Sequence, residues 1–228
     1  LLQHQMDGFI LAANRDDAPV VRLIEESNIP IVLVDRVLKG VNAPAVYSDS
    51  EAGARELTRH LIELGHTRIA LLASSLQQST SAQRAAGYRQ ALVDAGLPVD
   101  EALILHGSYS QQSGYQMMMQ LYEELDQLPT ALLTANNFIA LGVQRALSEL
   151  QLAIPQDISL VTFDDLPFQL YPEPFLTTAA QNPYRLGQEA ARLLVEQIQG
   201  RAGGSKVSVV LPVEIIIRHS TAPPASRR

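Results

Sequence analysis

Short runs of apolar residues, many of them β-branched, alternate along this chain with longer segments in which apolar residues recur every three to four positions. The short runs favour buried strands, and the longer periodic segments favour amphipathic helices. The expected strands are 8–12, 31–34, 45–47, 68–73, 102–105, 131–134, 158–162 and 177–180, with two more within 207–217. The expected helices are about 16–28, 51–64, 82–95, 110–125, 138–150 and 185–198. This alternation predicts an α/β fold with parallel sheets that helices cover on both faces.

Composition limits the classes of protein that this chain can belong to. Its 228 residues, 46% hydrophobic and 18% charged, suit one large or two smaller globular domains. The absence of cysteine excludes disulfide frameworks and cysteine-ligated metals. The longest apolar runs are only strand-length, and no signal-peptide pattern opens the sequence, so we expect no membrane partner. A formal net charge of −7 argues against this chain gripping nucleic acid itself, because phosphate contacts need clustered Lys and Arg.

Motifs for catalysis and cofactor binding are missing from the sequence. There is no GxGxxG, GxSxG or HExxH motif, and GGSK at 203–206 lacks the spacing of a phosphate loop. Asp164 and Asp165 are neighbours on an extended segment and point in opposite directions, which disfavours a shared-proton pair. The histidines show no metal-ligand spacing, so we expect each at a helix end or on the surface: His4, His60, His66, His106 and His219. We therefore predict no catalytic residue, no metal, no cofactor and no enzyme activity.

Several polar side chains come directly after expected strands. Asp35, Tyr109, Asn136 and Asp164 form this group, and Arg84 lies near the start of a helix that follows another strand. In open α/β folds, ligands bind where the carboxyl ends of parallel strands meet. Carboxylates, an amide, a guanidinium and an aromatic ring together recognise a polyhydroxylated ring through hydrogen bonds and stacking. Each residue taken singly fits a helix cap or the surface equally well, so the prediction depends on their joint placement.

Eight ordered motifs resemble the regulatory core of the lactose-repressor (LacI/GalR) family of bacterial transcription factors. They span residues 6–220 and are MDGFIL, IPIVLVDR, GHTRIALL, RAAGY, PTALLTANNFIALG, IPQDISLVTFDD, FLTTAAQ and IIIRHS. The resemblance implies a periplasmic-binding-protein-like fold with two doubly wound parallel-sheet lobes. The chain should cross between the lobes near Ser48–Ser50, Thr178–Gln181 and Leu211–Pro212. The implied parts are an incomplete N-terminal lobe (1–48 and 181–211), a C-terminal lobe (49–180 and 212–220) and a disordered tail (221–228).

The same resemblance implies an effector site and a function. The matching site residues are Asp35, Arg84, Tyr109, Asn136, Asp164 and Gln181. The implied protein is a cytoplasmic, homodimeric transcriptional repressor that responds to a small-molecule effector, a sugar or a sugar derivative. Family members carry a helix-turn-helix headpiece, a hinge and two βα units ahead of the strand in MDGFIL. We therefore expect this chain to be the effector-binding core of a longer protein that contacts operator DNA through that headpiece.

The chain departs from the family pattern at two positions near this site. It has Asn137 where the family usually has aspartate, and Thr162 where the family usually has glycine. The first change removes a charge at a helix start, and the second adds bulk, so the shape of the site should differ. Two other interpretations fit the fold. One is a sugar-binding protein of a transport system, and the other is a doubly wound enzyme, against which the missing catalytic motifs count.

Overall fold

The computed structural model describes residues 6–12, 26–38, 41–165, 174–200 and 208–225. The chain divides into two compact units: unit 1 comprises Leu1–Asp49 and Asn182–Pro212, and unit 2 comprises Ser50–Gln181 and Val213–Arg228. The chain therefore passes between the units three times, after residues 49, 181 and 212. Each unit has its own sheet and its own hydrophobic core.

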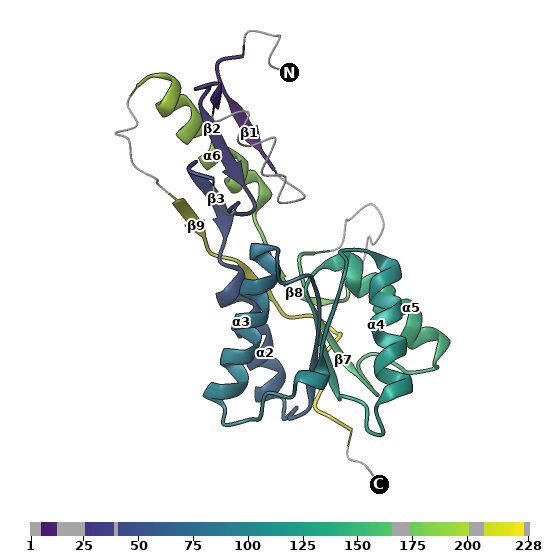
Figure 1. Ribbon diagram of the computed structural model, residues 1–228. Helices are drawn as coiled ribbons and strands as arrows, with labels where there is room; N and C mark the ends of the chain where they lie inside the picture. Colours follow the sequence, from purple (N-terminus) through teal and green to yellow (C-terminus); the bar gives the residue numbers. More distant parts are fainter. Residues whose placement is uncertain (1–5, 13–25, 39–40, 166–173, 201–207, 226–228) are drawn as a thin grey trace. The chain divides into compact units, whose positions relative to one another are not determined.

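Unit 1 is built on a four-stranded parallel sheet. Its strands are β1 (Phe9–Leu11), β2 (Ile31–Val34), β3 (Ala45–Ser48) and β9 (Ser208–Leu211), in the order β1-β2-β3-β9. Helix α6 (Pro183–Ile198) packs its apolar stripe against this sheet, with Leu186 and Leu193 in one cluster with Val32 and Val46 (Figure 1). The expected helix at 16–28 lies largely outside the described residues. At its expected end, Asn28 has a left-handed φ of 55°.

Unit 2 contains a six-stranded sheet. Its strands are β4 (Ile69–Ser74), β5 (Ile104–Gly107), β6 (Ala131–Thr134), β7 (Ser159–Phe163), β8 (Thr177–Ala180) and β10 (Glu214–Ile216), in the order β10-β8-β7-β6-β4-β5. Five strands are parallel, as expected, but β10 is antiparallel to β8. The reason lies in the connections: the chain leaves unit 2 just after β8 and re-enters just before β10. Because Glu214 pairs with Ala180, β10 begins where β8 ends and must run back.

Two pairs of helices cover the faces of this sheet (Figure 1). Helices α2 (Ser50–Glu63) and α3 (Ser79–Asp94) lie on one face, and α4 (Gln111–Glu124) and α5 (Asn137–Glu149) lie on the other. Alternate strand residues serve the two cores. In β4, Leu71 packs on the α2–α3 side and Leu72 on the α4–α5 side. This double burial explains why β4, β6 and β7 read as continuous apolar runs. Because the three strands pair in parallel, their carboxyl ends lie along one edge.

Two boundaries in unit 2 differ from expectation. Helix α3 begins at Ser79 instead of near residue 82, which places Thr80 one helical turn before Arg84. A 3-10 turn comprises Glu101–Leu103, although Ala102 and Leu103 were expected to be strand. The side chain of Asp100 caps this turn by accepting a hydrogen bond from the backbone amide two residues later at 3.1 Å.

The C-terminal residues differ from expectation, and His66 is buried in a way that the sequence did not indicate. His66 lies at a helix end, as expected, because its amide donates to the Leu61 carbonyl of α2 at 3.1 Å. It is nevertheless only 1% exposed, and its ring contacts Thr130, Ser159 and Ala222. Residues 221–225 were expected to be disordered, yet the Ala222 main chain both donates to and accepts from the Ser159 hydroxyl at 3.0 Å. These bonds satisfy buried polar groups, which explains why the tail is held against the sheet this far. Residues 226–228 lie outside the described ones.

Candidate ligand-binding site

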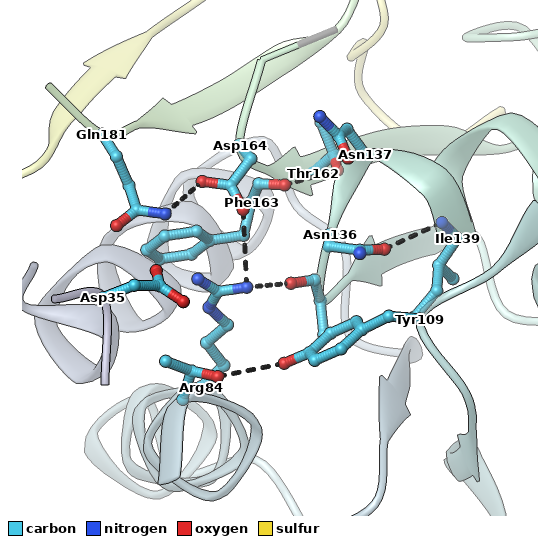
Figure 2. Close-up of polar contacts among 12 residues, drawn as sticks. Asp35, Arg84, Tyr109, Asn136, Asn137, Ile139, Thr162, Phe163, Asp164 and Gln181 are labelled. Atoms are coloured by element: carbon cyan, nitrogen blue, oxygen red, sulfur yellow. Dashed lines mark hydrogen bonds and ion pairs between the residues drawn. The ribbon is translucent and has the colours of Figure 1, made fainter. Parts of the chain in front are cut away.

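Asp164 ends a buried strand at the carboxyl edge of the unit 2 sheet. Every residue of β7 is buried, and the Asp164 amide extends the ladder by donating to the Ala179 carbonyl at 3.0 Å. Asp164 then adopts a left-handed φ of 66°, which is uncommon for a residue other than glycine. Its carboxylate faces Arg84 and Gln181 (Figure 2).

The guanidinium of Arg84 is buried beside this carboxylate. Arg84 is only 3% exposed, and its Cζ lies 3.6 Å from the centroid of the Phe163 ring. Its Nη1 donates to the Ala135 carbonyl and lies 3.7 Å from Asp164 Oδ2, which is an ion pair but too long for a hydrogen bond. Within the described part of the chain, its Nε has no hydrogen-bond partner. The Nε–H of Arg84 is therefore a buried donor that a polar ligand atom could accept from, which would remove the cost of leaving it unpaired.

Phe163 supports the guanidinium from the α2–α3 side of the sheet. The aromatic face attracts the cation, and the ring belongs to the core under α2. Gly53 on α2 leaves room for it, because a Cβ at that position would lie 2.7 Å from Phe163 Cε2. Sequence reasoning missed both residues. An aromatic residue directly before the strand-ending aspartate, and a glycine inside an expected helix, were the available signals.

Gln181 lies on the other side of the Asp164 carboxylate. Its Nε2 donates to Asp164 Oδ1 at 2.6 Å, while its Oε1 is buried and has no partner among the described residues. Asp164, whose side chain is 27% exposed, keeps Oδ2 for a further donor. Gln181 is also the last residue of unit 2 before the chain passes to unit 1.

Tyr109 and Asn136 lie in the loops after β5 and β6, at the same edge of the sheet (Figure 2). Tyr109 follows β5, and its hydroxyl lies 3.2 Å from the Thr80 hydroxyl on α3. Because the sequence predicted that α3 begins near residue 82, Thr80 was not recognised as a residue of this site. Asn136 caps α5, because its Oδ1 accepts a hydrogen bond from the Ile139 amide at 2.8 Å. This cap engages Oδ1, and the amide N–H groups of Asn136 stay available to a ligand.

The two positions that depart from the family pattern are both accommodated. Asn137 Nδ2 donates to the Asp165 carbonyl at 2.7 Å, which an ionised aspartate could not do. Thr162 is fully buried, and its hydroxyl donates to the Phe163 carbonyl at 3.1 Å. The added bulk therefore lies within the core.

Asp35 belongs to unit 1. It follows β2 with a left-handed φ of 76°, and its amide donates to the Val46 carbonyl at 2.9 Å. Its Oδ2 lies 3.4 Å from Arg36 Nη2. A cavity of about 500 Å³ in unit 1 is lined by Pro30, Pro44 and Gln197, among others. It lies at the amino end of β2, at the other end of the strand from Asp35, so it does not coincide with the predicted chemistry.

The unit 2 site therefore brings Arg84, Asp164 and Gln181 into contact, with Tyr109 reaching α3 through Thr80. The charges of the guanidinium and the carboxylate balance. Among the residues that the structure describes, no group of three or more His, Cys, Asp or Glu side chains could hold a metal ion. No helix in the described ranges is long and apolar enough to cross a membrane.

Comparison with known proteins defines the class. A family model for the periplasmic binding protein-like domain matches residues 58–221. The transcriptional repressor CytR of Escherichia coli (strain K12) is 34% identical over 97% of this chain and 64% of its own length. The chain spans 59–66% of the length of this and similar curated relatives. Its architecture is thus that of a periplasmic-binding-protein-like domain, as predicted.

Solved structures narrow the family. A LacI family transcriptional regulator from Enterococcus faecium with bound ribose matches with a TM-score of 0.84 and 31% identity, over 96% of this chain and 80% of that one. The complex of the transcriptional regulator CelR with cellobiose matches with a TM-score of 0.87 and 32% identity, over 95% and 66%. The chain belongs to the LacI family of transcriptional regulators and covers their effector-binding core.

Proposed function

We propose that this chain is the effector-binding and dimerisation core of a transcriptional repressor that responds to a sugar or a sugar derivative. The observation that carries the proposal is the cluster of Arg84, Asp164 and Gln181, where buried polar groups keep unused hydrogen-bonding capacity. Related regulators have been solved with ribose and with cellobiose. As such a regulator, the protein is not an enzyme, and it acts in the cytoplasm beside its operator DNA.

The unit 2 residues suit adjacent hydroxyl groups of one uncharged ligand. A sugar hydroxyl both donates and accepts, so Asp164 Oδ2 takes a hydrogen bond from one hydroxyl and Arg84 Nε donates to the next. Because the two charges balance each other, a neutral ligand adds no unpaired charge. Tyr109 offers a ring face for stacking, and the Asn136 amide offers donors. Asp35 stays a predicted contact, on the basis of the family resemblance.

Gln181 links the proposed ligand contact Asp164 to the segment where the chain passes from unit 2 to unit 1. Its amide holds Asp164 Oδ1, and the next residue, Asn182, caps α6 of unit 1. A ligand hydroxyl that competes for Asp164 changes this hydrogen bond at the point where the chain leaves unit 2. A ligand shifts an equilibrium only by its differential affinity, typically about 1–3 kcal/mol. In a homodimer, such a shift alters how two headpieces meet a two-fold operator.

Calorimetric titration with ribose and with cellobiose tests the site. We expect Arg84→Ala and Asp164→Asn to weaken binding of the cognate sugar about tenfold to a hundredfold, because each removes a charge-assisted hydrogen bond. Arg89→Ala is the matched control: Arg89 lies on the same helix and pairs with the exposed Glu101 at 2.8 Å. Thermal unfolding of each variant checks that the fold survives.

Two outcomes would contradict the assignment. If Arg84→Ala and Asp164→Asn lower the unfolding temperature but bind the sugar as tightly as the wild type, the pair is a structural ion pair. If neither sugar binds the wild type, the ligand class is wrong, and nucleosides are the next panel. The transport alternative is disfavoured because the matching relatives are regulators.

The DNA-binding part of the proposal has its own test. With a net charge of −7, the 228-residue chain alone should cause no sequence-specific retardation of an operator fragment at physiological salt. The full-length repressor should bind that fragment with an affinity that changes with effector concentration. An operator affinity that stays constant at every effector concentration would rule out the regulatory role.

A further inference from the structure

Asp165, the residue after the proposed ligand contact Asp164, is held from two sides. Its carboxylate forms a two-pronged ion pair with Arg218, with Nη2–Oδ2 at 2.6 Å and Nη1–Oδ1 at 2.9 Å. Its carbonyl accepts a hydrogen bond from Asn137 Nδ2 at 2.7 Å. Arg218 is itself anchored, because its Nη1 donates to the Leu176 carbonyl at 2.7 Å and its side chain is only 14% exposed. The segments that follow β7 and β10 thus meet the first residue of α5 at Asp165.

The conformation of Asp164 needs such support. A φ of 66° at a residue with a Cβ is unfavourable and persists only where the surroundings impose it. Two restraints act on Asp164 directly: its amide donates to the Ala179 carbonyl at 3.0 Å, and Gln181 donates to its Oδ1. Neither restrains the chain after Asp164. The anchoring of Asp165 supplies that missing restraint.

We propose that Asn137 and Arg218 are positioning residues: by anchoring Asp165, they hold Asp164 in the left-handed conformation that turns its carboxylate toward Arg84. No hydrogen bond or ion pair among the described residues joins either one to Arg84, so their effect passes through the main chain at Asp165. The inference rests on the proposed function only for its consequence in ligand binding. The positioning itself is a property of the free protein.

The proposal depends on an N–H donor at position 137. The aspartate that the family pattern carries there is nearly isosteric, but its oxygens would face the Asp165 carbonyl oxygen and repel it. Asn137→Asp is therefore a minimal change that reverses one hydrogen-bonding group. Arg218→Gln keeps a donor but loses the charge and the fork, and Arg218→Lys keeps the charge and N–H donors but loses the fork.

The matched control is Asn182→Asp. Asn182 caps α6 through its side-chain oxygen, which accepts from the Arg185 amide at 3.0 Å. Aspartate keeps that acceptor, so the variant makes the same change of charge without losing the hydrogen bond. Any general effect of the added negative charge will appear in this control.

Amide hydrogen exchange on the full 228-residue chain, without ligand, tests the positioning. We expect the Asp164 amide to exchange roughly tenfold faster in Asn137→Asp and Arg218→Gln, with Arg218→Lys in between, because one charged or buried hydrogen bond is lost. The amides of Ser159 and Leu160, earlier in the same strand, should keep their wild-type rates, as should all three amides in Asn182→Asp. An unchanged Asp164 rate in both variants overturns the proposal, and so does an equal rise at Ser159 and Leu160, which indicates general destabilisation.

Titration of the same variants with ribose and cellobiose separates the positioning from the proposed function. If a sugar binds, Asn137→Asp should weaken it in the wild-type background and have no further effect in the Asp164→Asn background. Additive losses in the two backgrounds would show that Asn137 does not act through Asp164 and would overturn the proposal. Faster exchange at Asp164 with no binding of either sugar supports the positioning and contradicts the sugar-effector function.

Discussion

The two ends of the unit 2 sheet differ in whether their buried polar side chains have hydrogen-bond partners. At the amino end, His66 is fully buried, and its two ring nitrogens contact Thr130, Ser159 and Ala222 at 2.8–3.1 Å. At the carboxyl end, Arg84 is almost as buried, yet its Nε and the Oε1 of Gln181 have no partner among the described residues. At the amino end, protein groups satisfy the buried polar atoms. At the carboxyl end, buried polar atoms can still form hydrogen bonds with a ligand or water.

This difference separates groups that stabilise the fold from groups that await a ligand. A buried donor or acceptor without a partner costs free energy, so an unpaired one is expected mainly where a ligand or water completes it. Variants at the amino end should therefore change stability and leave sugar binding intact. Variants at the carboxyl end should change sugar binding more than stability.

The largest effect on stability is expected for His66→Ala. The change empties a buried site and removes one hydrogen bond each from the Thr130 hydroxyl and the Ala222 carbonyl. We expect the free energy of unfolding to fall by about 2–3 kcal/mol, measured by urea denaturation at neutral pH. His106→Ala is the control, because His106 is exposed and makes only a 3.1 Å contact with the Ser74 carbonyl. Equal losses in the two variants would remove the distinction between the two ends of the sheet.

The same histidine predicts a dependence of stability on pH. Burial lowers the pKa of His66 below its usual value, and the pKa of His60, which contacts the tail through Thr221 at 3.0 Å, shifts the same way. The Ala222 carbonyl can only accept, so Nε2 carries the proton and Nδ1 accepts from the Thr130 hydroxyl. Protonating Nδ1 reverses that bond, so that the Thr130 hydroxyl must accept it, and places a positive charge in a buried site. Below the unfolded pKa of 6.5 the unfolded chain binds more protons, so stability is complete above that pH and falls with acidification until the lowered folded pKa is passed.

Urea midpoints measured between pH 7.5 and about pH 5 check this sign. His66→Gln should be less stable at neutral pH but should lose less on acidification than the wild type does. The remaining slope should include His60. A wild-type midpoint that rises on acidification, or a His66→Gln slope as steep as the wild-type one, would contradict the assignment.

The strand–helix alternation predicted most of the fold because β4, β6 and β7 are buried on both faces and read as unbroken apolar runs. The direction of β10 could not be predicted in this way. Its three residues carry no signal of orientation, and the direction follows from where the chain re-enters unit 2. The burial of His66 could not be predicted for a related reason. Its partners lie 64 to 156 residues away in the sequence, so no local pattern indicates its burial.

The candidate site was predictable where a residue follows a strand. Asp164 and Tyr109 have this signal, and the structure places both at the carboxyl edge of the unit 2 sheet. Phe163 and Thr80 were missed because their contributions depend on contacts across the sheet edge. From the sequence, Asn137 was interpreted only as the loss of a negative charge. In the structure its side chain donates a hydrogen bond to the Asp165 carbonyl, a contact that the sequence alone does not reveal.

The smallest effect is expected for Tyr109→Phe, which tests whether a satisfied group at the carboxyl end behaves like those at the amino end. The Tyr109 hydroxyl already has a partner in Thr80 at 3.2 Å, so its loss should cost the ligand little, less than about threefold in ribose or cellobiose affinity. Tyr109→Ala removes the ring as well and should cost roughly tenfold if the ring stacks on the sugar. Tyr115→Phe, which removes a hydroxyl bonded to the exposed Glu149, is the control. If Tyr109→Phe loses as much affinity as Tyr109→Ala, the hydroxyl binds the ligand directly, and its pairing with Thr80 does not mark it as a group that only stabilises the fold.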